Sequence, residues 1–289
     1  MAKPSNSDLY QDITNKIIAS IEQGTPPWRK PWTGGNQSIG FPLRSTGEPY
    51  RGINVLMLWL TANDDEFLSQ HWFTYKQAQS AGGQVRKGER STRVVYYSTL
   101  QRENDQGEEV AIPYLKTFSA FNADQIDGLE DRYYRLPDPI RDLGTKADPE
   151  LDAVFAKTGA NVITSGVPKA YYNRADDLIH MPPICTFHDA IGYYATLAHE
   201  VVHWTGAKSR LDRSHERRKA EYAFEELVAE IGACMVCARR GIAPDFPQSA
   251  AYIEGWLECL KEDKKAIFKA ASLAQKATDL ILDDELAPQ

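Results

Sequence analysis

Large apolar residues recur at every fourth position near the start of the chain: Leu9, Ile13, Ile17 and Ile21. This spacing predicts an amphipathic helix, and Gly24 follows where a C-terminal cap belongs. Further on, residues 93–97 and 114–122 have the composition of strands, and the polar residues 101–109 between them indicate a hairpin turn. The pattern predicts a small domain that mixes helix and strand.

The chain changes character between residues 129 and 149, where three prolines and several aspartates interrupt the apolar pattern. This is the composition of a linker. We therefore expect a first domain over residues 1–128 and a second over 150–289. The second half has mainly helical periodicity, with one expected strand at 177–181. The predicted fold class is α+β with two domains, the second of them helix-rich.

The most specific motif is H-E-x-x-H at His199-Glu200-Val201-Val202-His203. On a helix, residues four apart share one face, so both imidazoles would reach one zinc ion and Glu200 would act as the general base. Thr186 and Asp189 have the spacing of a helix N-terminal cap ahead of the following apolar run. The sequence therefore predicts a helical metal site with a catalytic Glu200.

A site of this kind needs a third protein ligand, and residues 222–238 form a second amphipathic helix that offers one. Glu226 is our choice of ligand, and Glu225 is its main competitor. Glu230, one turn after Glu226, would orient a ligand from behind. Zinc is the expected metal, and Mn²⁺ also suits two histidines and a carboxylate.

Composition excludes several classes of protein. The 289 residues include 42% hydrophobic and 25% charged residues, as in ordinary globular domains, and the net charge is −7. The longest apolar run, 53–60, is far short of the ~20 residues that cross a membrane. Four scattered cysteines make no disulfide framework, and the first residues are polar. We expect a cytoplasmic protein that does not enter membranes.

The acidic balance is unevenly distributed. Residues 1–125 contain 13 basic and 13 acidic residues, whereas 68–102 contain six basic residues and one acid. Aromatic residues run through the same region. Cations that neutralise phosphates and rings that stack on bases are what single-stranded DNA binding requires. The candidate DNA contacts are Trp28, Arg29, Lys30, Trp32, Arg51, Trp72, Tyr75, Lys76, Arg86, Lys87, Arg90 and Arg93. The same composition is also compatible with a buried aromatic core and a solvated charged face.

Several longer motifs resemble one known family. Residues 27–32, 46–54 and 121–125 resemble the single-stranded-DNA-binding domain of ArdC-type antirestriction proteins, and related domains occur in primases of conjugative plasmids. Residues 199–206, Arg210-Leu211 and 225–230 resemble the zincin-like metallopeptidase domain of the same family. The resemblance spans nearly the whole chain in the expected order.

The resemblance implies a plasmid-type protein that binds incoming DNA and shields it from host restriction endonucleases. Single-stranded DNA is the expected partner, and double-stranded DNA is a second candidate. It assigns His199 and His203 as metal ligands and Glu200 as catalytic base, and it leaves the third ligand open between Glu225 and Glu226. The alternative hypothesis is a DNA-directed zinc metalloprotease, whose main activity is the hydrolysis of a protein substrate. A purely structural metal is a third possibility.

Overall fold

The computed structural model describes residues 6–29, 40–103, 109–138, 141–213, 219–243 and 250–283. The first half contains three α-helices and six strands among these residues. They are α1 (Asn6–Glu22), β1 (Leu43–Arg44), α2 (Ile53–Asp64), β2 (His71–Phe73), α3 (Tyr75–Ser80), β3 (Gln84–Val85), β4 (Thr92–Glu103), β5 (Glu109–Asn122) and β6 (Ile126–Asp127). The helix predicted from apolar residues at every fourth position is α1, and Gly24 follows it with φ +77°.

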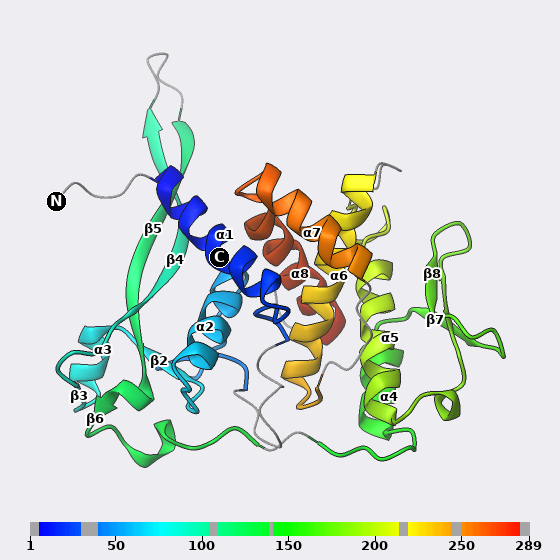
Figure 1. Ribbon diagram of the computed structural model, residues 1–289, viewed down its shortest axis with the longest axis horizontal. Coiled ribbons are helices and arrows are strands. Elements are labelled where there is room, and N and C mark those ends of the chain that lie inside the picture. Colours follow the sequence, from blue (N-terminus) through cyan, green and yellow to red (C-terminus); the bar gives the residue numbers. More distant parts are fainter. Residues whose placement is uncertain are drawn as a thin grey trace.

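The second half is helix-rich, as predicted. It contains α4 (Pro149–Lys157), β7 (Asn161–Thr164), β8 (Tyr171–Asn173), β9 (Leu178–Met181), α5 (Ala190–Thr205), α6 (Lys219–Arg239), α7 (Ala250–Glu262) and α8 (Ala266–Leu282). Strands β7, β9 and β8 form a small sheet in that order, and β9 corresponds to the predicted strand. Helices α5 and α8 both pack against α6, so α6 lies at the centre of this half (Figure 1).

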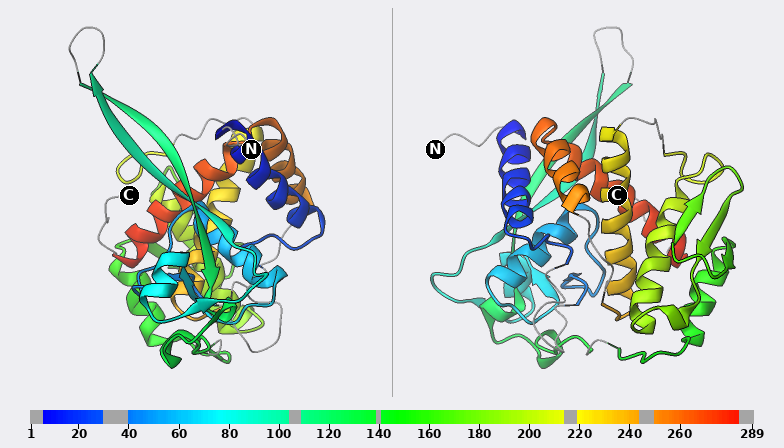
Figure 2. Two further views of the ribbon diagram at one scale, coloured as in Figure 1. Left: turned by 90° about the vertical axis from the view of Figure 1, so that its left-hand side faces the viewer. Right: turned by 45° about the vertical axis from the view of Figure 1, so that its right-hand side comes forward.

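The predicted hairpin is a long antiparallel ribbon. Strands β4 and β5 pair from Thr92 and Ala120 at the base to Glu103 and Glu109, and the turn between them lies outside the described residues. The sheet order is β1-β2-β5-β4, so β5 is joined to the body through β2. Both views in Figure 2 show the outer part of the ribbon projecting away from the helices.

One hydrophobic core joins the two halves of the chain. The apolar face of α1 and much of α2 pack in the same cluster as residues of α5, α6, α7 and α8. Two smaller clusters pack against the N-terminal sheet, one around Phe73 and the other around Trp72, which point to opposite faces of β2. The fold is thus a two-domain α+β architecture in which the first domain buries apolar surface against the second.

The start of the predicted linker is packed onto the first domain. Leu129 and Tyr133 are buried beside Phe73, and the Tyr134 hydroxyl donates to the carbonyl of Ile126. At the other end, the Asp148 side chain caps α4 by accepting a hydrogen bond from the amide of Leu151. The proline content indicated an irregular connection, but its aromatic residues provide enough apolar surface to anchor it. The stated domain boundaries remain a prediction.

In the part of the chain that the structure describes, no helix combines the length and apolar character needed to span a bilayer.

Candidate metal centre

Helix α5 carries the H-E-x-x-H motif. Asp189 is its N-cap and accepts a hydrogen bond from the amide of Gly192 at 2.8 Å. Thr186 lies in a preceding 3₁₀ turn, so the predicted cap is corrected from Thr186 to Asp189 itself. The helix ends at Thr205, before Gly206, as its apolar pattern indicated. His199 and His203 lie one turn apart and their side chains point the same way.

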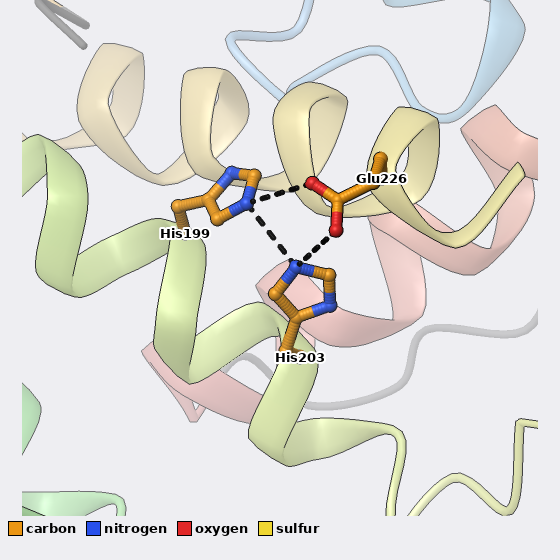
Figure 3. A group of neighbouring side chains, drawn as sticks. All are labelled: His199, His203 and Glu226. Atoms are coloured by element: carbon orange, nitrogen blue, oxygen red, sulfur yellow. Dashed lines mark hydrogen bonds and ion pairs between the residues drawn. The ribbon is translucent and has the colours of Figure 1, made fainter. Parts of the chain in front are cut away.

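Helix α6 brings a carboxylate to the two imidazoles. His199 and His203 Nε2 atoms are 3.1 Å apart, and the Glu226 oxygens lie 3.5 Å from His199 Nε2 and 3.6 Å from His203 Nε2. Figure 3 shows the three side chains converging from the two helices. The structure thus brings together the three residues that the sequence selected as metal ligands.

The donor set fits a divalent metal ion. Ligands at ~2.0–2.1 Å from a tetrahedral zinc lie roughly 3.3–3.4 Å from one another. The two Nε2 atoms are about this far apart, and each has one oxygen of the Glu226 carboxylate at a similar distance. Two imidazole nitrogens and a carboxylate oxygen suit zinc and also manganese. This geometry supports the prediction that Glu226 is the third ligand.

Glu225, the competing ligand, is turned toward other partners. One of its oxygens lies 3.3 Å from His203 Nδ1, the nitrogen on the far side of the ring from the metal position. The same carboxylate accepts two hydrogen bonds from Arg213, at 3.1 Å from Nε and 2.8 Å from Nη2. Glu225 thus contacts the ligand His203 on the side away from the metal position. The sequence had suggested Glu230 for this orienting role.

The carboxylates around the site shift the pKa of their neighbours. Burial lowers the pKa of His199, but the hydrogen bond to Glu226 and the charges of Glu200, Glu226 and Glu230 outweigh it and raise this pKa above its ordinary value. Burial raises the pKa of Glu226, while its interactions with His199 and His203 lower it below the usual range. Glu226 and His199 thus each favour the charged form of the other.

A cavity of about 770 Å³ opens over the metal centre. Its lining includes Glu200, the predicted general base, with His199 and His203. Strand β8, an edge of the small sheet, forms one wall through residues 171 and 172. The cavity therefore joins a potential base, the metal ligands and an exposed strand edge.

Two of the predicted DNA contacts lie in the core, and we correct them. Trp28 is fully buried and packs edge-to-face on Trp256 of α7, with ring centroids 5.9 Å apart. Trp72 is buried on β2 in a cluster with Leu58 and Val94. Neither indole can stack on a base, because both are buried. Burial of such large apolar rings stabilises the fold.

Two predicted arginine contacts pair with carboxylates of the second domain. Arg29 Nε lies 3.0 Å from Glu230 Oε1 on α6, and Arg51 pairs with the buried Asp279 on α8. Their charges are therefore offset within the protein, and we withdraw them as free phosphate contacts. Lys30 and Trp32 lie outside the described residues. The remaining predicted contacts are exposed in the first domain: Tyr75, Lys76, Arg86, Lys87, Arg90 and Arg93.

Sequence reasoning did not single out several residues of the site. Tyr222 lies one turn before Glu226 on α6 and hydrogen-bonds to it, so helical spacing was a usable signal. The hydroxyl of Tyr252, which lies on α7, is 3.3 Å from the Tyr222 hydroxyl. Arg213 lies in the loop after α5, and no local pattern connects it with Glu225. Its position depends on how α5 and α6 pack.

The H-E-x-x-H helix, the glutamate from the next helix and the small sheet define a zincin-like metallopeptidase domain. A family model described as "Zincin-like metallopeptidase" matches residues 149–273, and one described as "N-terminal domain of anti-restriction factor ArdC" matches residues 7–121. An uncharacterized protein, y4eC of Sinorhizobium fredii, is 36% identical over 94% of this chain and 91% of its own length. The chain belongs to the ArdC antirestriction family.

Solved structures agree with this assignment. The metal-free crystal structure of the antirestriction ArdC protein from plasmid R388 is 62% identical, has a TM-score of 0.86 and is covered over 96% of its length by 95% of this chain. The Mn(II)-bound structure is 59% identical, with a TM-score of 0.83 and coverage of 97% of this chain and 99% of that one. A DNA primase, TraC of Escherichia coli, is 35% identical over 95% of this chain, which spans only 27% of the primase.

Proposed function

We propose that the protein binds single-stranded DNA through its first domain and thereby protects incoming DNA from restriction endonucleases. The observation that carries this proposal is an exposed aromatic pair on the β4–β5 ribbon. Tyr96 and Phe118 are each 45% exposed, with ring centroids 6.2 Å apart. Two adjacent rings that remain accessible to solvent provide faces on which unpaired bases can stack.

The strand register adds a cation to this pair. Tyr96 is directly opposite Lys116, and Phe118 is opposite Val94, so all four side chains share one face of the ribbon. Val94 is buried, whereas Lys116 is exposed beside the rings. Aromatic faces for bases next to a cation for phosphate are the combination that single-stranded DNA sites use.

A second exposed group lies near the base of the ribbon. A hollow of about 590 Å³ is lined by Tyr75 and Lys87 together with Arg86. Arg86 is paired with Glu89 at 2.9 Å and with Asp127 at 3.4 Å, so its charge is partly offset. The contribution of this hollow to binding therefore depends mainly on Tyr75 and Lys87, and the ribbon pair is the better-supported contact.

The test is fluorescence anisotropy with a labelled single-stranded oligonucleotide at several salt concentrations. Each stacked base contributes ~1–3 kcal/mol, so Tyr96→Ala/Phe118→Ala should weaken binding by at least about tenfold. The control is Leu280→Ala, which removes a side chain that is 42% exposed on α8. Equal affinity for duplex and single strands, an affinity independent of salt, or unchanged binding by the double variant would refute the proposal.

The cavity supports a second candidate function, zinc-dependent peptide hydrolysis. A bound divalent ion would polarise a peptide carbonyl and make water more acidic. Glu200, whose side chain lines the cavity, would accept the proton from water and pass it to the leaving amine. An extended peptide would find a partner in the edge strand β8. This activity would be directed to proteins on DNA by the first domain.

Glu200→Gln separates the two functions. The substitution keeps the shape of the side chain but removes its ability to accept a proton. If DNA binding alone protects, restriction protection in cells should equal that of the native protein. If hydrolysis is required, protection should be lost while DNA and metal binding remain. Anisotropy and zinc titration of the same variant show whether those two properties are intact.

A further inference from the structure

Arg213 is a buried cation that connects helix α5 with helix α6 behind the metal centre. Its side chain is only 3% exposed. Nη1 donates to the Thr205 hydroxyl at 2.7 Å, and Nη2 donates to the carbonyl of Val202 at 2.5 Å. Both acceptors belong to the last turns of α5, where helix carbonyls lack partners within the helix. One guanidinium thus holds the C-terminal end of the helix that carries the histidines.

The other side of the same guanidinium holds Glu225. Its two hydrogen bonds to the carboxylate, from Nε and Nη2, form a bidentate pair, which fixes the plane of the carboxylate as well as its position. The side chain of Glu225 is only 9% exposed, so this contact with the guanidinium is made away from solvent. Glu225 is therefore held in one orientation behind the site.

The oriented carboxylate acts on His203. A carboxylate can only accept a hydrogen bond, so Glu225 favours the tautomer of His203 with its proton on Nδ1. Nε2, which faces His199 and Glu226, is then the nitrogen whose lone pair can bind a metal. A histidine held in this way is a better metal ligand, because its tautomer and ring orientation are set before the metal arrives. We propose that Arg213 and Glu225 are positioning residues that set the metal affinity of the centre through His203.

The packing around Arg213 leaves little room for other arrangements. A Cβ atom at Gly206 would lie 2.8 Å from Arg213 Nη2 and 3.0 Å from its Cζ. The backbone at Gly206, directly after α5, thus approaches the guanidinium closely. The absence of a side chain at residue 206 allows Arg213 to reach both the carbonyl of Val202 and Glu225.

Arg210 provides a matched control within the same loop. It also donates to an α5 carbonyl, that of Trp204 at 2.7 Å, and its ion pair is with Asp177. The two arginines therefore resemble each other in length, location and contact with the helix end. Arg210 also contacts both oxygens of its carboxylate partner, Asp177. Arg213 differs in that its partner, Glu225, contacts His203 of the metal centre.

The experiment measures zinc affinity of the full-length protein by competition with a fluorescent chelator. Loss of a residue that orients a ligand typically weakens metal binding 10–100-fold, so we expect about that factor for Arg213→Met and Glu225→Ala. Arg210→Met should bind zinc like the native protein. Arg213→Lys should rescue only part of the affinity, because an ammonium group cannot make the bidentate contact.

Two further readouts distinguish positioning from a general loss of structure. The visible spectrum of the Co²⁺-loaded protein should change in Arg213→Met and Glu225→Ala and stay the same in Arg210→Met. Thermal unfolding of the metal-free variants shows whether each is folded at the temperature of the titration. Native zinc affinity and spectrum in folded Arg213→Met would overturn the proposal. The proposal rests on the metal site, which the titration of the native protein tests separately.

Loss of zinc binding in Glu225→Ala has another explanation, in which Glu225 itself is the third ligand. Glu226→Gln distinguishes the two. If Glu225 only positions His203, Glu226→Gln removes a ligand and weakens zinc binding more than Arg213→Met does. A Glu226→Gln variant with native zinc affinity would refute the assignment of Glu225 as a positioning residue.

Discussion

The contact between Arg51 and Asp279 predicts how strongly the two domains depend on each other. Arg51 precedes α2 and pairs with Asp279 of α8, whose side chain is fully buried while that of Arg51 is 23% exposed. Asp279 also accepts a hydrogen bond from Gln275 at 2.9 Å, and Gln275 accepts one from the amide of Gly52 at 3.0 Å. Arg51→Met would leave a buried carboxylate without its cation.

The expected cost follows from this burial. Removing one partner of a buried ion pair costs roughly 3–5 kcal/mol, and the partial exposure of Arg51 places this case at about 3 kcal/mol. For a protein of this size, 1 kcal/mol shifts the unfolding midpoint by roughly 2–4 °C, so we expect a decrease of about 6–12 °C. Because the domains share a core, unfolding should remain a single transition.

The assay is thermal unfolding followed by circular dichroism and tryptophan fluorescence. Arg44→Met is the control, because Arg44 pairs with Glu48 on the surface at 3.5 Å and should contribute less than about 1 kcal/mol. Replacing both partners, Arg51→Met with Asp279→Leu, should recover much of the lost stability, since no charge is then left buried. At a temperature where the single variant is folded, its affinity for single-stranded DNA should be native.

A midpoint within 2 °C of the native value for Arg51→Met would refute the reasoning. So would two separate transitions of which only one moves, because that would mean that the domains unfold independently. A large loss of DNA affinity in the folded variant would restore Arg51 as a DNA contact, as the sequence suggested.

Two further predictions concern the metal centre and the helices that form it. A Cβ atom at Gly232 of α6 would lie 3.0 Å and 3.1 Å from the Val202 methyl carbons of α5. Gly232→Val should therefore force the helices apart, lower the stability by about 1–3 kcal/mol and weaken zinc binding. Native stability and zinc affinity in this variant would contradict the prediction. Zinc at 100 times its dissociation constant should stabilise the protein by about 2.7 kcal/mol, so a chelator should lower the unfolding midpoint reversibly. An unchanged midpoint would mean that the folded protein binds no zinc under these conditions.

Much of the local structure was predictable because it depends on neighbours in the chain. Apolar residues at every fourth position predicted α1, and strand-like composition on both sides of a polar turn predicted the β4–β5 ribbon. The H-E-x-x-H motif needed only helical geometry to bring His199 and His203 to one face. In the same way, Glu226 was selected because it falls on an amphipathic helix with small neighbours.

The sequence by itself determined the main helices and strands, the H-E-x-x-H motif and the family resemblance. The tertiary structure decided which polar and aromatic side chains are accessible to a ligand such as DNA. Trp28 and Arg51 looked like DNA contacts in composition, but α7 and α8, more than 200 residues further along the chain, cover the indole and pair with the guanidinium. The choice between Glu225 and Glu226 likewise depends on the packing of α5 against α6, which brings Arg213 to one of them. Burial and ion pairing are contacts between distant segments, and local composition carries no record of them.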